Sequence, residues 1–345
     1  MRILLLKTWI TNIGNAFIDK GAKTCIKNAF PNAEIIEVSG FSNMTVMTSG
    51  TKFIARYIGE KIGKFGNLLI NYGDNKMKKV TEKNNFVNIG EMIDADFAVL
   101  PGCVLDIYIE FYMKTLIKIR EAGIPILLLG AGGHNYTYEK SQKVKSYFKR
   151  IEFSALLTRD STAYRMYSNC FKDSYDGIDC GFFINDWYNP PQSKEPFAVN
   201  TFDTMREPKI DIDCKIIRAH HGTIISTYSG IIPAIGSILN LKTRVKRFDV
   251  LNENNFFVSD CLEDYLFLYS NAKEVHSDRV HACVASLAYG TPTKFYFKTP
   301  RAKLFDRIGA HKIYNQIVLP DNYDIENEKK LQVLALRNVV ERFQS

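Results

Sequence analysis

Short apolar runs alternate along the whole chain with longer stretches in which apolar positions recur at helical spacing. The short runs are bounded by turn residues and indicate buried strands, and the longer stretches indicate helices packed on one side. This alternation is typical of βαβ units in a mostly parallel sheet. In the first half it predicts strands at 3–6, 34–38, 97–100, 126–129 and 155–157 and helices near 16–29, 52–70, 107–122, 138–150 and 161–168.

A segment rich in proline and polar residues, Asn189–Pro196, interrupts this pattern and is the natural linker. Beyond it the pattern predicts strands at 197–199, 215–219, 247–250, 274–276 and 293–297, helices at 261–271 and 280–289, and a last amphipathic helix at 326–343. We therefore expect an α/β fold with two Rossmann-like domains, whose mostly parallel sheets face an interdomain cleft. The expected units are an N-terminal domain at 1–190, a C-terminal domain at 191–325, and a helix at 326–345 that closes the fold.

Composition and charge indicate the class of protein and the kinds of partner that it can bind. With 46% hydrophobic and 24% charged residues among 345, the chain is globular rather than disordered or fibrous. A formal net charge of +8 favours anionic partners, but no zinc-finger spacing or RNA-binding aromatic motif occurs, so we expect no nucleic acid. The seven cysteines form no CxxC pair and are expected to be reduced, and the first apolar run is too short for a signal peptide. These features favour a cytoplasmic protein.

Two stretches bear on membrane contact. Residues 224–241 are uncharged, but Pro233 and several polar residues interrupt them, which favours a buried helix and loop over a membrane span. Residues 51–69 combine an apolar stripe with basic neighbours. This second pattern is typical of an ordinary surface helix packed on a core, and the alternative is a helix lying on an anionic membrane.

Several loops that follow predicted strands carry groups suited to an anion. Asn12, Gly14 and Asn15 open a helix after the first strand, where free backbone amides favour negative charge; a simple turn with an asparagine cap is the other interpretation. Gly132 and Gly133 follow the fourth strand and are placed to cradle a phosphate or carboxylate. The next residue, His134, is either a site residue or a polar loop residue.

Three further segments place titratable side chains at strand ends. Arg159 and Asp160 either form a structural pair with a capping aspartate, or Arg159 turns into the cleft and binds an anionic substrate. Arg279 and His281 begin a helix of small residues, where one side chain can bind an anion and the other can move a proton. The other interpretation makes Arg279 part of an ion pair and leaves His281 satisfied within the helix.

Adjacent histidines, His220 and His221, end another predicted strand. Neighbouring residues on an extended chain point to opposite faces, so joint ligation of one metal ion is unfavourable. We expect one of the two histidines to be catalytic and the other structural.

In order and spacing these segments resemble the polysaccharide pyruvyltransferase family, whose members have a fold similar to GT-B glycosyltransferases. The resemblance spans about 12–309, and two departures are Asn15, where aspartate is common, and Pro101-Gly102-Cys103, where a glycine triplet is common. The segments that carry it are Asn12-Ile13-Gly14-Asn15, Ala95–Gly102, Gly130-Ala131-Gly132, Arg159-Asp160, Asp179–Phe183, Asp278–Ala282 and Gly290-Thr291-Pro292.

The resemblance implies transfer of a pyruvyl group from phosphoenolpyruvate to a sugar diol of a cell-surface glycan precursor, which gives a cyclic ketal. It implies no cofactor and no metal, a sugar or lipid-linked acceptor, and a site of action in the cytoplasm or on the inner face of the membrane. The resemblance places the Arg279-x-His281 element in the donor site. Together with the residue patterns above, the expected site residues are His281 and His221 for catalysis, Arg279, Arg159, Gly132 and Gly133 for donor binding, and Asn12, Gly14, Asn15 and His134 for acceptor binding.

Two other functions fit the same fold, because a fold does not fix a function. One is a GT-B glycosyltransferase that uses a nucleotide sugar, although no Glu-x7-Glu pair occurs in the second half of the chain. The other is a non-catalytic glycan-binding protein, which would tolerate the loss of Arg279 and His281.

Overall fold

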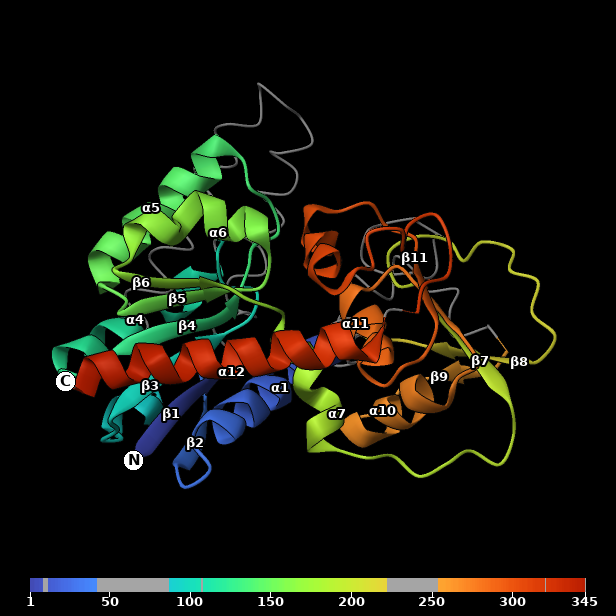
Figure 1. Cartoon of the computed structure of the whole chain (residues 1–345), viewed down its shortest axis with the longest axis horizontal. Helices are drawn as coiled ribbons and strands as arrows, with labels where there is room; N and C mark the ends of the chain where they lie inside the picture. Colours follow the sequence, from blue (N-terminus) through green and yellow to red (C-terminus); the bar gives the residue numbers. More distant parts are fainter. Residues whose placement is uncertain (9–11, 42–86, 107, 222–253, 320, 345) are drawn as a thin grey trace, which may run out of the picture.

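The computed structural model of the protein describes residues 1–8, 12–41, 87–106, 108–221, 254–319 and 321–344 (Figure 1). The expected helix at 52–70, with its amphipathic stretch at 51–69, lies outside these described residues. The same holds for the segment 224–241 and for the strand expected at 247–250.

The first half of the chain forms a six-stranded sheet in the order β2-β1-β3-β4-β5-β6, and every neighbouring pair is parallel. All five strands predicted for this half are present, within two residues at each end. The sixth strand was missed because its sequence, Asp173-Ser-Tyr-Asp176, is polar and lies at a sheet edge. The strands are β1 (Arg2–Lys7), β2 (Glu34–Ser39), β3 (Phe97–Pro101), β4 (Ile126–Ala131), β5 (Ala155–Thr158) and β6 (Asp173–Asp176).

Helices cover both faces of this sheet, which is why its central strands are apolar on both sides; all five residues of β3 are buried. The helices are α1 (Ile13–Ala29), α4 (Ile109–Glu121), α5 (Tyr138–Ile151) and α6 (Ser161–Tyr167), with short 3₁₀ turns η2 (Ile89–Met92) and η3 (Ser168–Cys170).

The second half forms a five-stranded sheet in the order β11-β10-β7-β8-β9, again parallel throughout. Its strands are β7 (Phe197–Thr201), β8 (Lys215–Ala219), β9 (Phe256–Phe257), β10 (Val275–Ser277) and β11 (Thr293–Phe295). The two halves are joined through η4 (Cys180–Phe183), α7 (Ile184–Trp187) and the irregular segment 189–196, and α10 (Leu262–Asn271), α11 (Val280–Ala288) and η6 (Pro300–Ile308) complete the second half.

Helix α11 is buried at all nine of its positions because alanine, cysteine and serine dominate its sequence. Small side chains let a helix approach its neighbours closely, and α11 contacts η4, α10 and α1. The start of α11 is thereby fixed between the two sheets.

One hydrophobic cluster runs from the α1 side of the first sheet through η4 to α10 and α11, so the two sheets share a continuous core. Helix α1 lies at its centre. A Cβ atom at Gly21 of α1 would lie 1.8 Å from the carbonyl oxygen of Cys180, so only glycine permits this approach between α1 and η4. A second cluster fills the opposite face of the first sheet under α4, α5 and α6.

The last helix, α12 (Asn322–Gln344), leaves the second half and returns to the first, where it contacts α1, β5 and β6 (Figure 1). Leu336 and Val340 enter the shared core. The buried side chain of Lys329 binds Asp186 at 2.6 Å and Glu326 at 2.7 Å. The sequence predicted this helix, and the structure begins it four residues earlier than expected.

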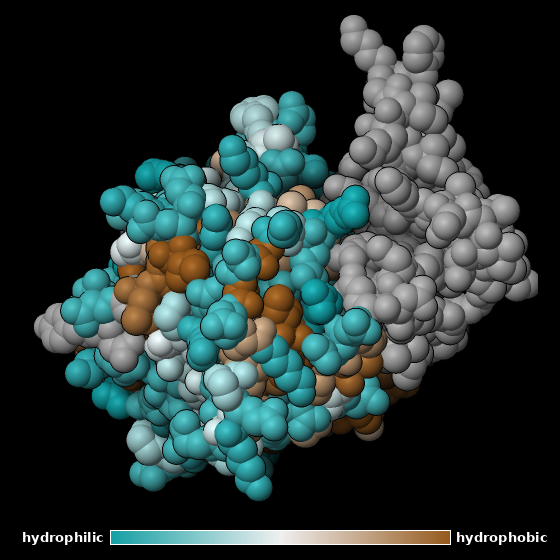
Figure 2. All heavy atoms as spheres, turned by 90° about the vertical axis from the view of Figure 1, so that its right-hand side faces the viewer, coloured by the Kyte–Doolittle hydropathy of each residue, from teal (hydrophilic) through white to brown (hydrophobic). Residues whose placement is uncertain are grey.

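The outer surface is mainly polar. Figure 2 shows hydrophilic residues over most of the visible face, with hydrophobic residues gathered in smaller groups between them. In the described part of the chain, no helix combines the length and apolar character needed to cross a bilayer.

Candidate active site

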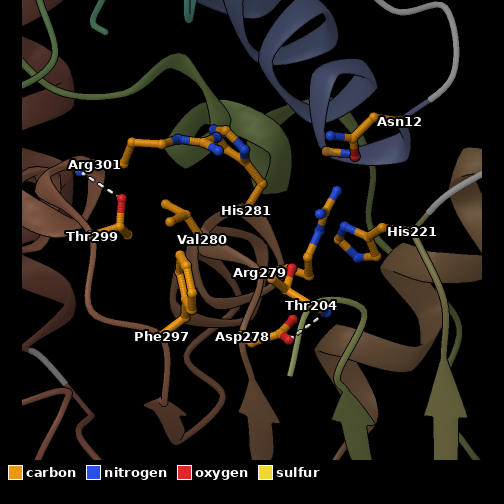
Figure 3. Close-up of a pocket in the computed structure, with 11 residues that line it drawn as sticks. Asn12, Thr204, His221, Asp278, Arg279, Val280, His281, Phe297, Thr299 and Arg301 are labelled. Carbon is orange, nitrogen blue, oxygen red and sulfur yellow. Dashed lines mark hydrogen bonds between the residues drawn. The ribbon is translucent and has the colours of Figure 1, made fainter. Parts of the chain in front are cut away.

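A pocket with an empty volume of about 430 Å³ lies where the carboxyl ends of four strands of the second sheet meet the start of α1 (Figure 3). This is the edge at which open parallel sheets bind ligands. The residues that line it come from the loops after β1, β7, β8, β10 and β11: Asn12, Gly14, Thr204, His221, Asp278, Arg279, Val280, His281, Phe297, Thr299 and Arg301.

Asp278 organises the floor of this pocket. Its carboxylate accepts the backbone N–H groups of Asp203, Thr204 and Met205 at 3.0, 2.7 and 2.8 Å, which ties the loop after β7 to the start of α11. Burial raises the pKa of Asp278 above its usual value, although these amides oppose the shift. Asp278 is therefore a positioning residue, and it presents the next residue, Arg279, to the pocket.

Arg279 is the N-cap residue of α11 and keeps about a quarter of its side chain exposed. Its Nε lies 3.3 Å from Asp203, which also pairs with Nδ1 of His220 at 2.5 Å. Burial opposes ionisation of Asp203, but the His220 hydrogen bond and the Arg279 charge hold its pKa below the usual range. A tethered, partly exposed guanidinium at a helix start is well suited to an anion.

His281 is buried in the first turn of α11, with Nε2 3.4 Å from a carboxylate oxygen of Asp179. Burial lowers the pKa of His281 to about 4, and Asp179 only partly compensates. The imidazole is therefore neutral in the free protein at pH 7. A Cβ atom at Gly14 would lie 3.0 Å from Cβ of His281, so the start of α1 lies directly against this histidine.

Arg159 does not line the pocket, because it is fully buried in an ion pair with Asp179 at 3.0 Å. Asp160 caps α6 by accepting the N–H of Ala163 at 2.8 Å. The structure thus matches the structural interpretation of Arg159 and Asp160, with Asp179 as the partner of the arginine. The predicted donor contact of Arg159 is replaced by an indirect role: it holds the carboxylate that contacts His281.

His220 and His221 are separated, as their extended backbone requires. His220 pairs with Asp203 outside the pocket lining, and His221 lines the pocket with Nε2 2.5 Å from the hydroxyl of Tyr269. Burial lowers the pKa of His221 well below its usual value. Among the described residues, the buried Nδ1 of His221 has no hydrogen-bond partner, so it is available to a ligand.

Arg301 is a pocket residue that the sequence analysis missed. It lies in the first turn of η6, after the last strand of the second sheet. Its Nε is buried and finds no partner among the described residues, and burial lowers the pKa of the guanidinium. Figure 3 shows its side chain reaching toward the imidazole of His281. A basic residue just after a predicted strand end was the available signal.

Besides Arg159, four predicted residues are not brought to the pocket: Gly132, Gly133, Asn15 and His134. The prediction that the two glycine amides bind the donor is corrected, because they bond to the carbonyl of Gly102 at 3.0 Å and the hydroxyl of Tyr136 at 2.9 Å. Gly132 also makes room for Arg159, whose Nε would lie 2.2 Å from a Cβ atom there.

Two of the four residues predicted for acceptor binding, Asn15 and His134, have other partners. Asn15 lies in the first turn of α1, where its N–H bonds to the carbonyl of Asn12 at 2.9 Å. His134 pairs with Asp106 and Cys103 in a separate cluster. Of the predicted acceptor group, only Asn12 and Gly14 line the pocket, and the side chain of Asn12 also caps α1 by accepting the N–H of Gly14 at 3.0 Å.

Two parallel sheets share one core, and a basic pocket lies at the carboxyl edge of the second; this is a GT-B-like α/β architecture. The sequence model of the polysaccharide pyruvyl transferase family matches residues 12–293, and the chain belongs to that family. It is therefore a transferase.

Several solved structures are similar to this chain. A putative UDP-N-acetylglucosamine 2-epimerase from Listeria monocytogenes is similar over 99% of this chain and 89% of its own, with 10% identity and a TM-score of 0.50. The UDP-N-acetylglucosamine 2-epimerase from Rickettsia bellii has 12% identity over 99% and 97%, with a TM-score of 0.48. E. coli ADP-heptose lps heptosyltransferase II has 11% identity over 100% of both chains, with a TM-score of 0.40. No curated protein matches this sequence.

Proposed function

We propose that this chain transfers the pyruvyl group of phosphoenolpyruvate to a sugar diol of a glycan precursor, forming a cyclic ketal. The observation that carries the proposal is the buried Nε of Arg301, which has no partner among the described residues, in a pocket that also holds Arg279. A buried polar group without a partner is costly, and an anionic ligand would supply one. Phosphoenolpyruvate carries two anionic groups, a phosphate and a carboxylate, to match the two guanidinium groups.

The chemistry assigns a distinct role to each side chain. A proton adds to the methylene carbon of phosphoenolpyruvate, and one sugar hydroxyl adds to C2. The second hydroxyl then adds to C2 as the C2–O bond to phosphate breaks, so the products are a ketal and inorganic phosphate. Of the two hydroxyl protons, one replaces the proton given to the methylene carbon and the other leaves with the phosphate. Arg279 and Arg301 offset the donor charge, and His281, held by Asp179, carries the proton.

The acceptor belongs on the α1 side of the pocket in this proposal. Asn12 and Gly14 line that side, next to His281. A sugar hydroxyl bound there would lie near the imidazole that accepts or delivers the proton. We place the reaction in the cytoplasm, on the inner face of the membrane when the acceptor is lipid-linked; this location rests on the family resemblance.

The first test is Arg279→Ala, which we expect to weaken phosphoenolpyruvate binding about 10- to 100-fold, the usual value of a hydrogen bond to a charged group. Isothermal titration calorimetry measures it. Arg218→Ala is a matched control, because Arg218 is also about a quarter exposed and ion-paired, to Glu207 at 2.9 Å, but lies outside the pocket lining. Equal losses in both variants would contradict the assignment of Arg279.

The same titrations separate the proposal from its alternatives. Saturable binding of a nucleotide sugar, with none of phosphoenolpyruvate, would favour a glycosyltransferase. Glycan binding that survives the loss of both Arg279 and His281 would favour a non-catalytic binding protein.

A second test uses the neutral state of His281. Its pKa is near 4 in the free protein, and a bound dianion favours the protonated imidazole, so donor binding at pH 5–6 should take up close to one proton. Calorimetry in buffers of different ionisation enthalpy measures this number. His281→Gln is the reference, because the donor phosphate itself titrates near pH 6 in both proteins. Equal uptake in the two proteins would show that His281 stays neutral.

A further inference from the structure

A second cluster of reactive side chains lies outside the pocket lining, at the carboxyl edge of the first sheet. Cys103 and Asp106 follow β3, and His134 follows β4, the neighbouring parallel strand. The Cys103 Sγ lies 3.3 Å from Nδ1 of His134, and a carboxylate oxygen of Asp106 pairs with the same Nδ1. The three ligand atoms lie within 4.8 Å of one another.

The contacts of the His134 imidazole distinguish between a catalytic relay and a metal site. In a catalytic cysteine–histidine–aspartate relay, the thiol and the carboxylate bind opposite nitrogens of the imidazole. Here both approach Nδ1, and the distance from Sγ to Nε2 is longer, at 3.9 Å. One ring nitrogen carries a single proton or a single lone pair, so it cannot satisfy both groups in this way. Three ligand atoms that converge on one point are instead typical of a metal site.

The ligand types fit zinc, and so does the separation of the sulfur and nitrogen ligands. A thiolate, an imidazole and a carboxylate are its usual ligands, at about 2.0 to 2.3 Å from the ion. Two tetrahedral ligands at these distances are separated by roughly 3.5 Å, close to the 3.3 Å between Sγ of Cys103 and Nδ1 of His134.

Neighbouring groups hold the ligands in place. The second carboxylate oxygen of Asp106 accepts the N–H of Tyr108 at 2.7 Å, and Nη2 of Arg159 donates to Sγ of Cys103 at 3.4 Å. Such outer contacts are what orient metal ligands. The two loops are also joined by backbone hydrogen bonds, from Leu105 to Gly132 at 2.9 Å and from Gly132 to Gly102 at 3.0 Å.

We propose that Cys103, Asp106 and His134 bind one divalent transition-metal ion, with Zn²⁺ as the best match. Three protein ligands leave a fourth tetrahedral position for water or for a hydroxyl of a ligand. The side chain of His134 is 42% exposed, which gives an ion access from solvent. Arg159 contacts both Cys103 and Asp179, and Asp179 contacts His281. An ion bound to Cys103 would therefore stabilise the residues that hold His281 without lying in the transferase pocket.

The test uses Co²⁺ as a spectroscopic probe on the full-length, reduced, metal-free protein. We expect one equivalent of Co²⁺ to give a thiolate-to-cobalt charge-transfer band, which Zn²⁺ then removes by competition. Cys103→Ser should abolish the band, and His134→Ala should weaken binding at least tenfold. Cys261→Ser is the matched control: Cys261 is an exposed cysteine 3.1 Å from the carboxylate of Glu263, and this variant should retain the band.

Three results would overturn the proposal: no band, a band that persists in Cys103→Ser, or binding only at millimolar cation. If Cys103→Ser fails to fold, as judged by circular dichroism, Asp106→Asn decides the question. It keeps an acceptor for the Tyr108 N–H and removes one ligand charge, so it should bind Co²⁺ more weakly with the thiolate band still visible. Unchanged affinity in both Asp106→Asn and His134→Ala would exclude the site. None of these readouts depends on transferase activity.

Discussion

Replacing His281 with alanine should lower turnover about 10²- to 10⁴-fold, the usual contribution of a general acid or base. Donor affinity should change much less, because the guanidinium groups that bind the anion remain. The imidazole lies between the start of α1 and Asp179, on the side of the pocket where the proposal places the acceptor. Steady-state kinetics with the acceptor diol, together with calorimetric donor titration, separates the two effects.

His276→Ala is the control for this experiment. His276, on β10, is as buried as His281, but it bonds to Tyr296 and Glu274 and does not line the pocket. It should retain turnover with a comparable loss of packing. Full turnover in His281→Ala would move the proton carrier elsewhere, first to His221. Unfolding of His281→Ala with a folded His276→Ala would mean that His281 is structural.

Replacing Arg301 with glutamine should weaken donor binding by about 30- to 1,000-fold, since truncating one partner of a buried charge pair costs about 2 to 4 kcal/mol. The thermal stability of the free protein should stay the same or rise, because burial lowers the pKa of the guanidinium and its Nε has no partner among the described residues. Calorimetry and thermal melting measure the two quantities on the same sample. A stability loss with unchanged affinity would make Arg301 a structural residue.

For Arg159→Gln we expect the opposite effect on stability. Arg159 is also buried, but it is paired with Asp179, so removing it leaves an uncompensated carboxylate and should destabilise the fold by about 3 to 5 kcal/mol. The two variants therefore distinguish a ligand-binding role for Arg301 from a structural role for Arg159. Similar melting temperatures for both would contradict this distinction.

The alternation of apolar and polar residues predicted the strands well because parallel strands in a covered sheet are apolar on both faces. β3 illustrates this, since it is buried throughout. The polar edge strand β6 lacks this signal and was missed. Arg279 and His281 were also predictable, because they occupy neighbouring positions at one helix start.

The site features that the sequence did not predict depend on contacts between distant segments. Asp179 and His281 are 102 positions apart, and only the packing of η4 on α11 brings them together. The role of Arg301 depends on how its long side chain crosses the pocket, which no local pattern encodes. Gly132 and Gly133 were assigned to anion binding because glycine-rich loops often bind phosphate, but hydrogen bonds within the fold turn their amides inward.

The return of α12 to the first sheet has a consequence for the order of biosynthesis. Domains usually fold as units, with the N-terminal one first, while the ribosome is still extending the chain. Here Leu336 and Val340 belong to the core beside α1, and Gln332 accepts the N–H of Ile178 at 2.8 Å. The first half thus remains without part of its core and one buried hydrogen-bond partner until the second half has been translated. We therefore expect the first half to complete its core only after α12 has been made.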